Sequence, residues 1–484
     1  MLFNSIDFAI FLPIVFVLYW FVTNSNLRWQ NMLLVVASYI FYGWWDWRFL
    51  SLILFSSVVD YLIGVQLDKQ DEERKRKMLL WTSMLVNLGF LGFFKYYNFF
   101  LENFINAFSI FGMSINARSL SIVLPVGISF YTFQTMSYTI DVYRRKLKPT
   151  HDIVAFMAFV SFFPQLVAGP IERATNLLPQ FFEKRKFDYH LAVNGLRQML
   201  WGFFKKVVIA DGCAEFANMI FNNSEAYSGS TLLLGAFFFS FQIYGDFSGY
   251  SDIAIGTARL FGFDLKQNFA FPYFSRDIAE FWRRWHISLS TWFRDYLYIP
   301  LGGSRGGLAQ KVRNTFIIFI VSGFWHGAKW TFVVWGALNA FYFLPLLLLN
   351  RNRINTDIVA EGKRLPNSRE LFQIVGTFLL TVLAWVFFRA DDMSHALSFL
   401  KTIFSKSLFS VPQFSNRETA AAMVGFVLLF MIIEWMGRQE KFAIEKIGLT
   451  WSRPIRYGMY YFLVVLIMYK SFGAEEAQFI YFQF

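Results

Sequence analysis

Residues 1–22 read MLFNSIDFAIFLPIVFVLYWFV, a stretch that is long and apolar enough to cross a lipid bilayer as one helix. It lacks the basic flank and the small-residue cleavage site of a signal peptide, so we expect it to remain as the first membrane helix. Asp7 lies near its start and no basic residue precedes it, whereas Arg28 follows it. Because basic flanks stay in the cytoplasm, the N-terminus is predicted to lie outside.

Comparable apolar stretches recur along the rest of the chain. They lie at about 32–44, 49–66, 79–99, 121–140, 231–262, 315–347, 371–388, 420–436 and 457–471. The basic segments DKQDEERKRK (68–77) and RRKLK (144–148) both fall where the count of crossings places the cytoplasm. The pattern predicts an all-α, polytopic membrane protein with about ten to twelve membrane helices.

The composition supports the same class. Of 484 residues, 56% are hydrophobic and 16% are charged, whereas a soluble domain devotes about a quarter of its residues to charge. In such a protein the net charge of +12 indicates topology and contact with membrane lipids, so no nucleic-acid partner is expected. The single cysteine, Cys213, excludes an intrachain disulfide and any multi-cysteine metal site. We expect one integral-membrane domain over residues 1–484 and no metal.

Three segments interrupt the simple pattern of crossings. The run 153–169 ends in FFPQLVAGP (162–170), whose prolines and glycine break a helix, so it is expected to be re-entrant. Residues 189–220 are predicted to form a helix that carries the basic pair Lys205 and Lys206. The polar stretch NRNRINTDIVAEGKRLPNSRE (350–370) is predicted to be a cytoplasmic loop.

The segment DIAEFWRRWHISLSTWFRDYLYIPLGGSRGG (277–307) is predicted to form an amphipathic helix. Trp285 falls on its aromatic face, and His286 lies at the border of that face, one turn from Arg283. Such a helix lies at a membrane interface or over a pocket, so these three residues are candidates for a cavity wall. An ordinary surface helix with a structural histidine is the alternative.

The glycine-rich sequence LGGSRGG (301–307) follows, together with Arg305, Lys311 and Arg313. Backbone amides in such a loop can bind phosphate, and the basic side chains would contribute. The loop lacks the G-K-[ST] ending of a P-loop, so an ordinary positive loop is the alternative.

His326 lies in SGFWHGAKW (322–330), inside an otherwise apolar run. Ionisable groups in membrane segments usually face a bundle interior or a water-filled cavity, and burial disfavours the charged imidazolium. A neutral imidazole can accept a proton, so His326 is a candidate general base, with Trp325 beside it as part of the wall. The alternative is a histidine that joins two helices by hydrogen bonds.

A third polar group lies in FQIYGDFSGYSDIAIG (241–256). Asp246, Ser248 and Asp252 occur within an apolar run, which favours a polar cavity wall over contact with lipid. Pairing of the two carboxylates with arginines elsewhere is the alternative.

The motifs FWRRWHISLSTWFRDYLYIPLGG (281–303) and GFWHGAKWTFVVWGALN (323–339) resemble the membrane-bound O-acyltransferase family, in particular its alginate-acetylating branch. YGDFSGYSDIAIG (244–256), the opening residues and the ending FIYFQF (479–484) are similar to that branch too. The resemblance implies a helical bundle around a central funnel. It also implies that His326 is the family's invariant-type histidine and His286 its second histidine.

The resemblance further implies a substrate set and a location. Acetyl-CoA would donate from the cytoplasm, its phosphates guided by Arg305, Lys311 and Arg313, and no cofactor would be bound permanently. The acceptor would be an exported polysaccharide, reached through a periplasmic or extracellular SGNH-hydrolase-like acetyltransferase, and the chain would lie in the bacterial inner membrane. A flippase for a lipid-linked sugar and a non-catalytic scaffold of a glycan secretion complex are the alternatives.

Overall fold

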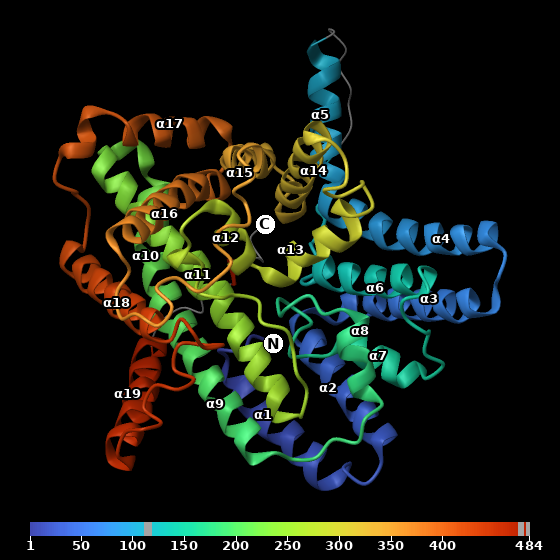
Figure 1. The fold of residues 1–484 in the computed structure, drawn as a ribbon. Helices are drawn as coiled ribbons and strands as arrows, with labels where there is room; N and C mark the ends of the chain where they lie inside the picture. The colour runs from blue at the N-terminus through green and yellow to red at the C-terminus, as the bar shows by residue number, and fades with distance from the viewer. Residues whose placement is uncertain (111–118, 473–478, 481–484) are drawn as a thin grey trace. The chain divides into compact units, whose positions relative to one another are not determined.

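The structure is a computed structural model that describes residues 1–110, 119–472 and 479–480. Within these ranges the chain is helical and contains no β-strand (Figure 1). The predicted all-α class is therefore confirmed.

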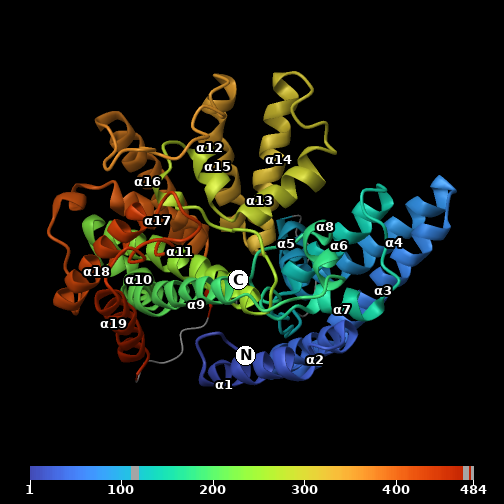
Figure 2. The ribbon, with the colours of Figure 1, turned by 60° about the horizontal axis from the view of Figure 1, so that its bottom comes forward.

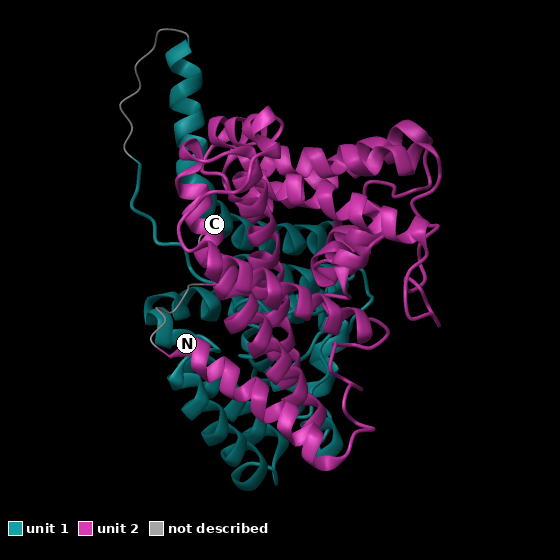
Figure 3. Cartoon of the chain, turned by 90° about the vertical axis from the view of Figure 1, so that its left-hand side faces the viewer, with its two compact units in different colours: residues 1–192, 257–266 teal, residues 193–256, 267–484 magenta. Residues whose placement is uncertain are grey.

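The chain divides into two compact units, each coloured separately in Figure 3. Unit 1 comprises residues 1–192 and 257–266, and unit 2 comprises residues 193–256 and 267–484. The expectation of a single domain over 1–484 stays a prediction.

In the part of unit 1 that the structure describes, eight α-helices lie wholly within the unit. They are α1 (Ile6–Val17), α2 (Leu27–Asp46), α3 (Leu50–Lys69), α4 (Glu73–Leu91), α5 (Tyr97–Ile110), α6 (Ile128–Tyr143), α7 (Ile153–Ser161) and α8 (Ala174–Leu177). Side-chain caps mark several starts: Asn26 accepts hydrogen bonds from the first turn of α2, and Asp152 does so at α7. α7 ends at Ser161, directly before the Pro- and Gly-containing segment that was predicted to break it.

The remaining helices lie wholly or mostly in unit 2. They are α9 (Tyr189–Phe203), α10 (Asp211–Asn222), α11 (Gly229–Leu260), α12 (Ile278–Arg284), α13 (Ile287–Phe293), α14 (Leu308–His326), α15 (Trp330–Leu348), α16 (Ser368–Arg389), α17 (Met393–Ile403), α18 (Arg417–Met436) and α19 (Arg453–Ser471). A π-helical segment, Phe204–Ala210, joins α9 to α10 and carries Lys205 and Lys206. The predicted helix over 189–220 is thus present as a nearly continuous one.

Among the described residues, five helical segments are long and apolar enough to cross a membrane. They are Leu27–Lys69, Glu73–Ile110, Trp330–Leu348, Ser368–Arg389 and Arg417–Met436. A shorter apolar helix covers Ile6–Val22. These segments support a multi-pass membrane protein, whereas the expected ten to twelve crossings and the funnel stay predictions.

The apolar run 315–347 forms two helices instead of one. α14 ends at His326, Gly327 is extended, and α15 begins at Trp330 and returns alongside α14 (Figure 2). The two helices approach closely at glycines: a Cβ on Gly336 would lie 2.2 Å from the Phe319 carbonyl oxygen, and one on Gly323 would lie 2.2 Å from that of Phe332. The close contact of the two backbones therefore depends on small residues.

The segment 277–307 also departs from the expected single helix. α12 ends at Arg284, and α13 begins only after Trp285 and His286. His286 has a left-handed backbone (φ 44°), a conformation that breaks an α-helix and that non-glycine residues seldom adopt. The prediction of one continuous helix was therefore wrong at His286.

Candidate active site

A channel of about 230 Å³ in unit 2 brings both candidate histidines together. His286 and His326 line it, and their ring centroids lie 6.5 Å apart. Although they contact the channel, the two residues are only 1% and 4% exposed. The channel therefore gives a small group access to two imidazoles that are otherwise buried.

The channel follows one face of α14. Thr315, Ile318, Phe319, Ser322 and His326 line it at helical spacing. At 1.5 Å per residue the eleven steps from Thr315 to His326 correspond to about 16 Å. One end of the channel therefore carries the histidines, and the other lies near the start of α14.

His326 is held at the end of α14 by aromatic rings. Its ring contacts Trp325, Trp335 and Phe388 at centroid distances of 5.0, 5.3 and 5.3 Å. The rings of Trp335 and His326 are perpendicular, so the edge of one meets the face of the other. This packing fixes the orientation of the imidazole.

Hydrogen bonds with Asn268 hold His286 in its unusual backbone conformation. Ile287 N donates to the Asn268 carbonyl oxygen at 2.9 Å, and Ser288 N donates to Asn268 Oδ1 at 3.2 Å. His286 Nδ1 lies 3.2 Å from the same Oδ1. Asn268 thus caps the start of α13 and contacts the imidazole in one arrangement.

These contacts determine which nitrogen of His286 carries the proton. A backbone N–H can only donate, so the Asn268 atom that faces Ser288 N must be the amide oxygen. Asn268 Nδ2 in turn donates to Ser251 Oγ at 3.1 Å, which is consistent with that orientation. Since Oδ1 can only accept, His286 Nδ1 must be protonated, and in the neutral ring Nε2 carries the lone pair.

The ring of His286 is neutral at physiological pH. Burial lowers the pKa of His286 to about 3, because desolvation disfavours the charged form. His286 lies outside the five candidate membrane spans, in the break between α12 and α13. Phe247 packs against the ring at a centroid distance of 4.5 Å and contributes to this burial.

The other residues predicted to form the cavity wall here are Trp285, Trp325 and Arg283, and only one of them lines the channel. Trp285 lines the channel. Trp325 does not line it but packs beside both histidines, 5.0 Å from His326 and 6.1 Å from His286 between ring centroids. Arg283 lies outside the lining and contacts the polar loop that follows α15.

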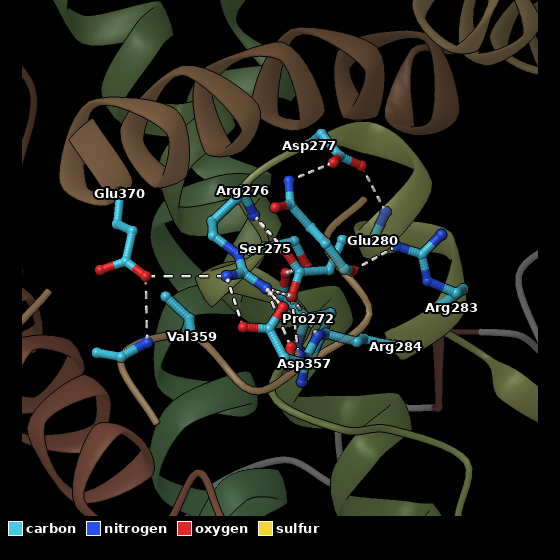
Figure 4. Close-up of polar contacts among 12 residues, drawn as sticks. Pro272, Ser275, Arg276, Asp277, Glu280, Arg283, Arg284, Asp357, Val359 and Glu370 are labelled. Atoms are coloured by element: carbon cyan, nitrogen blue, oxygen red, sulfur yellow. Dashed lines mark hydrogen bonds and ion pairs between the residues drawn. The ribbon is translucent and has the colours of Figure 1, made fainter. Parts of the chain in front are cut away.

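That loop is attached to α12 by a cluster of arginines, shown in Figure 4. Arg283 donates to the carbonyl oxygens of Asn352 and Asn355 at 2.8 and 2.6 Å. Arg276 and Arg284 both donate to the carbonyl oxygen of Asp357, at 3.0 and 2.9 Å. We call residues 350–357 the strap, because its Asn352 and Arg353 line the channel while these bonds hold its backbone.

The cluster contains carboxylates as well as arginines. Glu280, which is buried, lies within ion-pair distance of Arg276 and Arg284, at 3.1 and 2.8 Å. Asp357 pairs with Arg276 at 2.9 Å, and this guanidinium keeps the pKa of Asp357 below its ordinary value. The ion pair between Asp357 and Arg276 therefore stays charged throughout the physiological pH range.

The predicted acidic residues of α11 lie in a buried ionic network and not in the channel lining. Asp252 pairs with Lys205 at 2.5 Å, and Asp246 pairs with Lys206 at 2.8 Å. Asp246 Oδ2 also accepts from the backbone N–H of Ile480 at 2.7 Å. Ser248 donates to the Tyr244 carbonyl oxygen within α11. The cations that pair with the two carboxylates are lysines and not the arginines considered from the sequence.

Two residues of the C-terminal motif belong to this region. Phe479 and Ile480 are buried, and the Phe479 ring packs on Phe247 and Tyr250 at centroid distances of 6.1 and 5.0 Å. Phe247 in turn contacts His286. Residues 481–484 of the motif lie outside the described residues.

The basic residues expected to guide phosphate lie near the far end of the channel but do not line it. Arg305 belongs to the glycine-rich loop, and Lys311 and Arg313 belong to the first turns of α14. Asn314 Nδ2 donates to the carbonyl oxygens of Leu301 and Gly303, both at 3.2 Å, and so holds that loop beside α14. Ser304 of the loop does line the channel.

The structure adds residues that the sequence patterns did not single out. These are Asn268, Arg294, Ser322, Asn352 and Arg353. Arg294 lies within the segment 277–307 that was predicted to be one helix, but the helical spacing did not single it out. Asn268 and Arg353 lie in loops without periodicity, so no local signal distinguishes them.

A model of the membrane-bound O-acyltransferase family matches residues 40–388. The chain is 39% identical to the probable alginate O-acetylase AlgI of Pseudomonas aeruginosa, over 91% of this chain and 82% of that protein. It is 36% identical to the peptidoglycan O-acetyltransferase of Helicobacter pylori, over 83% and 79% of the two chains. It is 28% identical to the teichoic acid D-alanyltransferase of Bacillus subtilis, over 56% and 70%. The family model spans both histidine motifs of the channel.

Proposed function

The chain belongs to the membrane-bound O-acyltransferase family, and we propose that it transfers acetyl groups from a cytoplasmic thioester to an exported polysaccharide. Family membership makes it an acyltransferase and sets aside the flippase and the scaffold considered from the sequence. The single observation that carries the proposal is the meeting of His286 and His326 in one channel.

The donor is acetyl-CoA, whose acetyl thioester enters the channel from the end farther from the histidines. The strap belongs to the polar stretch 350–370, which is rich in basic residues and therefore expected in the cytoplasm. The apolar lining of Ile318, Phe319 and Phe343 suits an uncharged thioester arm, because such a lining cannot solvate charge.

His326 acts as the general base. Its imidazole takes the proton from an acceptor hydroxyl while the hydroxyl oxygen attacks the thioester carbonyl carbon. A carbon–oxygen bond forms, the carbon–sulfur bond breaks, and the departing thiolate takes the proton back from His326. The products are an ester and a free thiol, and a positioned base contributes about 10²–10⁴-fold to such a step.

His286 orients the acceptor. In the neutral tautomer its Nδ1–H is directed at Asn268, so Nε2 can only accept a hydrogen bond. This favours contact with a hydroxyl over the alternative role, donation to the oxyanion that develops on the thioester carbonyl.

The acceptor is a polysaccharide outside the inner membrane, reached directly or through a periplasmic or extracellular SGNH-hydrolase-like acetyltransferase. Relatives named for alginate, peptidoglycan and teichoic acid support a surface glycan or a related polymer as the destination. The N-terminus outside and the strap inside complete the proposed orientation.

The test is transfer of labelled acetyl from acetyl-CoA by the purified chain in liposomes, with the partner acetyltransferase and its glycan supplied. His326→Ala should lower turnover by at least about 10²-fold, because the base is lost. His190→Ala is the matched control, since His190 is exposed and outside the channel lining, and it should keep wild-type turnover. Near-normal turnover by folded His326→Ala would refute the general-base role.

A further inference from the structure

We propose that Arg294 and Arg353 form a phosphate-binding site at the end of the channel opposite the histidines. This inference rests on the proposed function, because it assigns the site to the phosphate of the thioester donor. It also differs from the expectation from the sequence, which gave that task to Arg305, Lys311 and Arg313.

The charge of the channel lining supports an anionic ligand. Among the described residues that line the channel, the ones charged at neutral pH are Arg294 and Arg353, and none is acidic. Both are exposed, so a group outside the channel can reach them. Planar guanidinium groups bind phosphate oxygens through paired, charge-assisted hydrogen bonds.

The length of the channel matches a pantetheine arm. The lining of α14 runs about 16 Å from His326 to Thr315. An extended pantetheine arm, which separates a thioester from its phosphate, has a comparable length. A donor with its carbonyl at His326 would therefore bring its phosphate to the far end.

Three elements place both arginines at the end of the channel near Thr315: the segment that follows His286, the helix α15 and the strap. From His286, α13 and the turn after it lead to Arg294 and Tyr298. α15 runs antiparallel to α14, so its end and the strap lie beside the start of α14. Arg353 therefore lies at the same end as Thr315.

The surroundings hold these groups in place. Arg283 donates to the carbonyl oxygen of Asn352, directly before Arg353. The hydroxyls of Tyr298 and Ser304, which also line the channel, are 3.0 Å apart and supply further polar contacts. The end of the channel thus combines two cations with hydroxyl groups on fixed backbone.

Binding is measured by isothermal titration of the purified full-length chain in detergent with coenzyme A, 4′-phosphopantetheine and pantetheine, none of which can be turned over. The wild type should bind the two phosphorylated ligands more tightly than pantetheine. Arg353→Ala and Arg294→Ala should each weaken coenzyme A about tenfold, the loss expected for one charge-assisted hydrogen bond, and leave pantetheine unchanged.

Two further variants separate phosphate recognition from damage to the fold. Arg351→Ala is the matched control, because Arg351 is exposed in the same strap but does not line the channel, and it should bind coenzyme A normally. Asp295 pairs with Arg294 at 2.8 Å. Asp295→Asn removes the competing anion and should tighten coenzyme A binding, a gain that misfolding cannot produce.

Comparison of the three ligands distinguishes which phosphate the arginines bind, the 4′-phosphate of the arm or the phosphates of the nucleotide. An arginine effect on both phosphorylated ligands supports the 4′-phosphate, which coenzyme A shares with the prosthetic arm of a carrier protein. An effect on coenzyme A alone supports the site with the nucleotide phosphates as its target. Equal losses for pantetheine, or a wild type that binds all three ligands equally, would overturn the proposal. Arginine-dependent binding without acetyl transfer would instead refute the proposed function alone.

Discussion

At the scale of single residues, the most informative group is the His286–Asn268 pair. The sequence predicted both histidines, because an ionisable side chain among apolar and aromatic residues is conspicuous. It could not predict Asn268, which reaches His286 from a loop eighteen residues earlier in the chain. The tautomer of His286 is inferred from the hydrogen bond that Ser288 N donates to Asn268 Oδ1. The spacing of residues in the sequence does not predict this contact.

We predict that Asn268 is a positioning residue. Asn268→Leu removes the acceptor that holds His286 Nδ1–H, so kcat for acetyl transfer should fall roughly 10- to 100-fold, as for other residues that orient a catalytic imidazole, with little change in KM for acetyl-CoA. Asn268→Asp keeps an acceptor oxygen and should restore much of kcat. Initial rates over a range of acetyl-CoA concentrations give the two constants.

The fold of each variant can be checked through Cys213, the single cysteine of the chain, which is buried. A maleimide dye should label it only when the protein unfolds on heating. If Asn268→Leu and Asn268→Asp lose activity equally while both unfold at the wild-type temperature, the hydrogen bond to His286 has no role in turnover.

At the scale of helices, the α14–α15 hairpin shows what sequence patterns could and could not predict. The apolar run over 315–347 correctly predicted helix. Hydropathy alone does not predict the turn at Gly327 that divides this run into α14 and α15. The single helix expected over 277–307 failed for a related reason. Hydrogen bonds from Ile287 N and Ser288 N to Asn268, a distant residue, compete with helical continuation at His286.

We predict that the hairpin is sensitive to one methyl group. In Gly336→Ala the new Cβ would lie 2.2 Å from the Phe319 carbonyl oxygen, so the helices must move apart. Overpacking of this kind costs about 1–3 kcal/mol, which should lower the midpoint of Cys213 labelling on heating.

Gly376 provides the matched control for this change. It lies inside α16, and a Cβ there would meet no atom within 4 Å. Gly376→Ala should leave the midpoint unchanged or raise it, because alanine favours helix by up to about 1 kcal/mol. Equal midpoints for the two alanine variants would contradict the close contact of α14 and α15.

At the scale of the whole molecule, composition predicted a multi-pass helical protein, and the family confirms the membrane class. The number of crossings could not be derived in the same way. α11 carries Asp246 and Asp252 but pairs them with Lys206 and Lys205 inside unit 2, so charge along a helix does not by itself exclude burial. Hydropathy therefore identifies the apolar spans more readily than helices with internal ion pairs.

We predict that the two ends of α16 lie on opposite sides of the membrane. Lys363 precedes this candidate span and Lys401 follows it, and both are exposed. In a Cys213→Ser background, Lys363→Cys should react with a membrane-impermeant maleimide only after the cells are permeabilised. Lys401→Cys should react in intact spheroplasts. The reverse pattern would invert the proposed orientation, and labelling of both from one side would show that α16 does not cross.

The strap is attached through carbonyl oxygens of its main chain, at Asn352, Asn355 and Asp357. Every amino acid supplies that same oxygen, so the attachment at Asn352 does not depend on the side chain at that position. Asn355 adds a side-chain contact, because its Nδ2 donates to Asp277 Oδ2 at 2.6 Å. Arg353 can therefore be replaced without loss of the hydrogen bonds that hold the neighbouring backbone. Evolution or protein engineering could therefore change the donor selectivity of the channel by replacing the side chain at position 353. Such a replacement would leave the helices and both histidines unchanged.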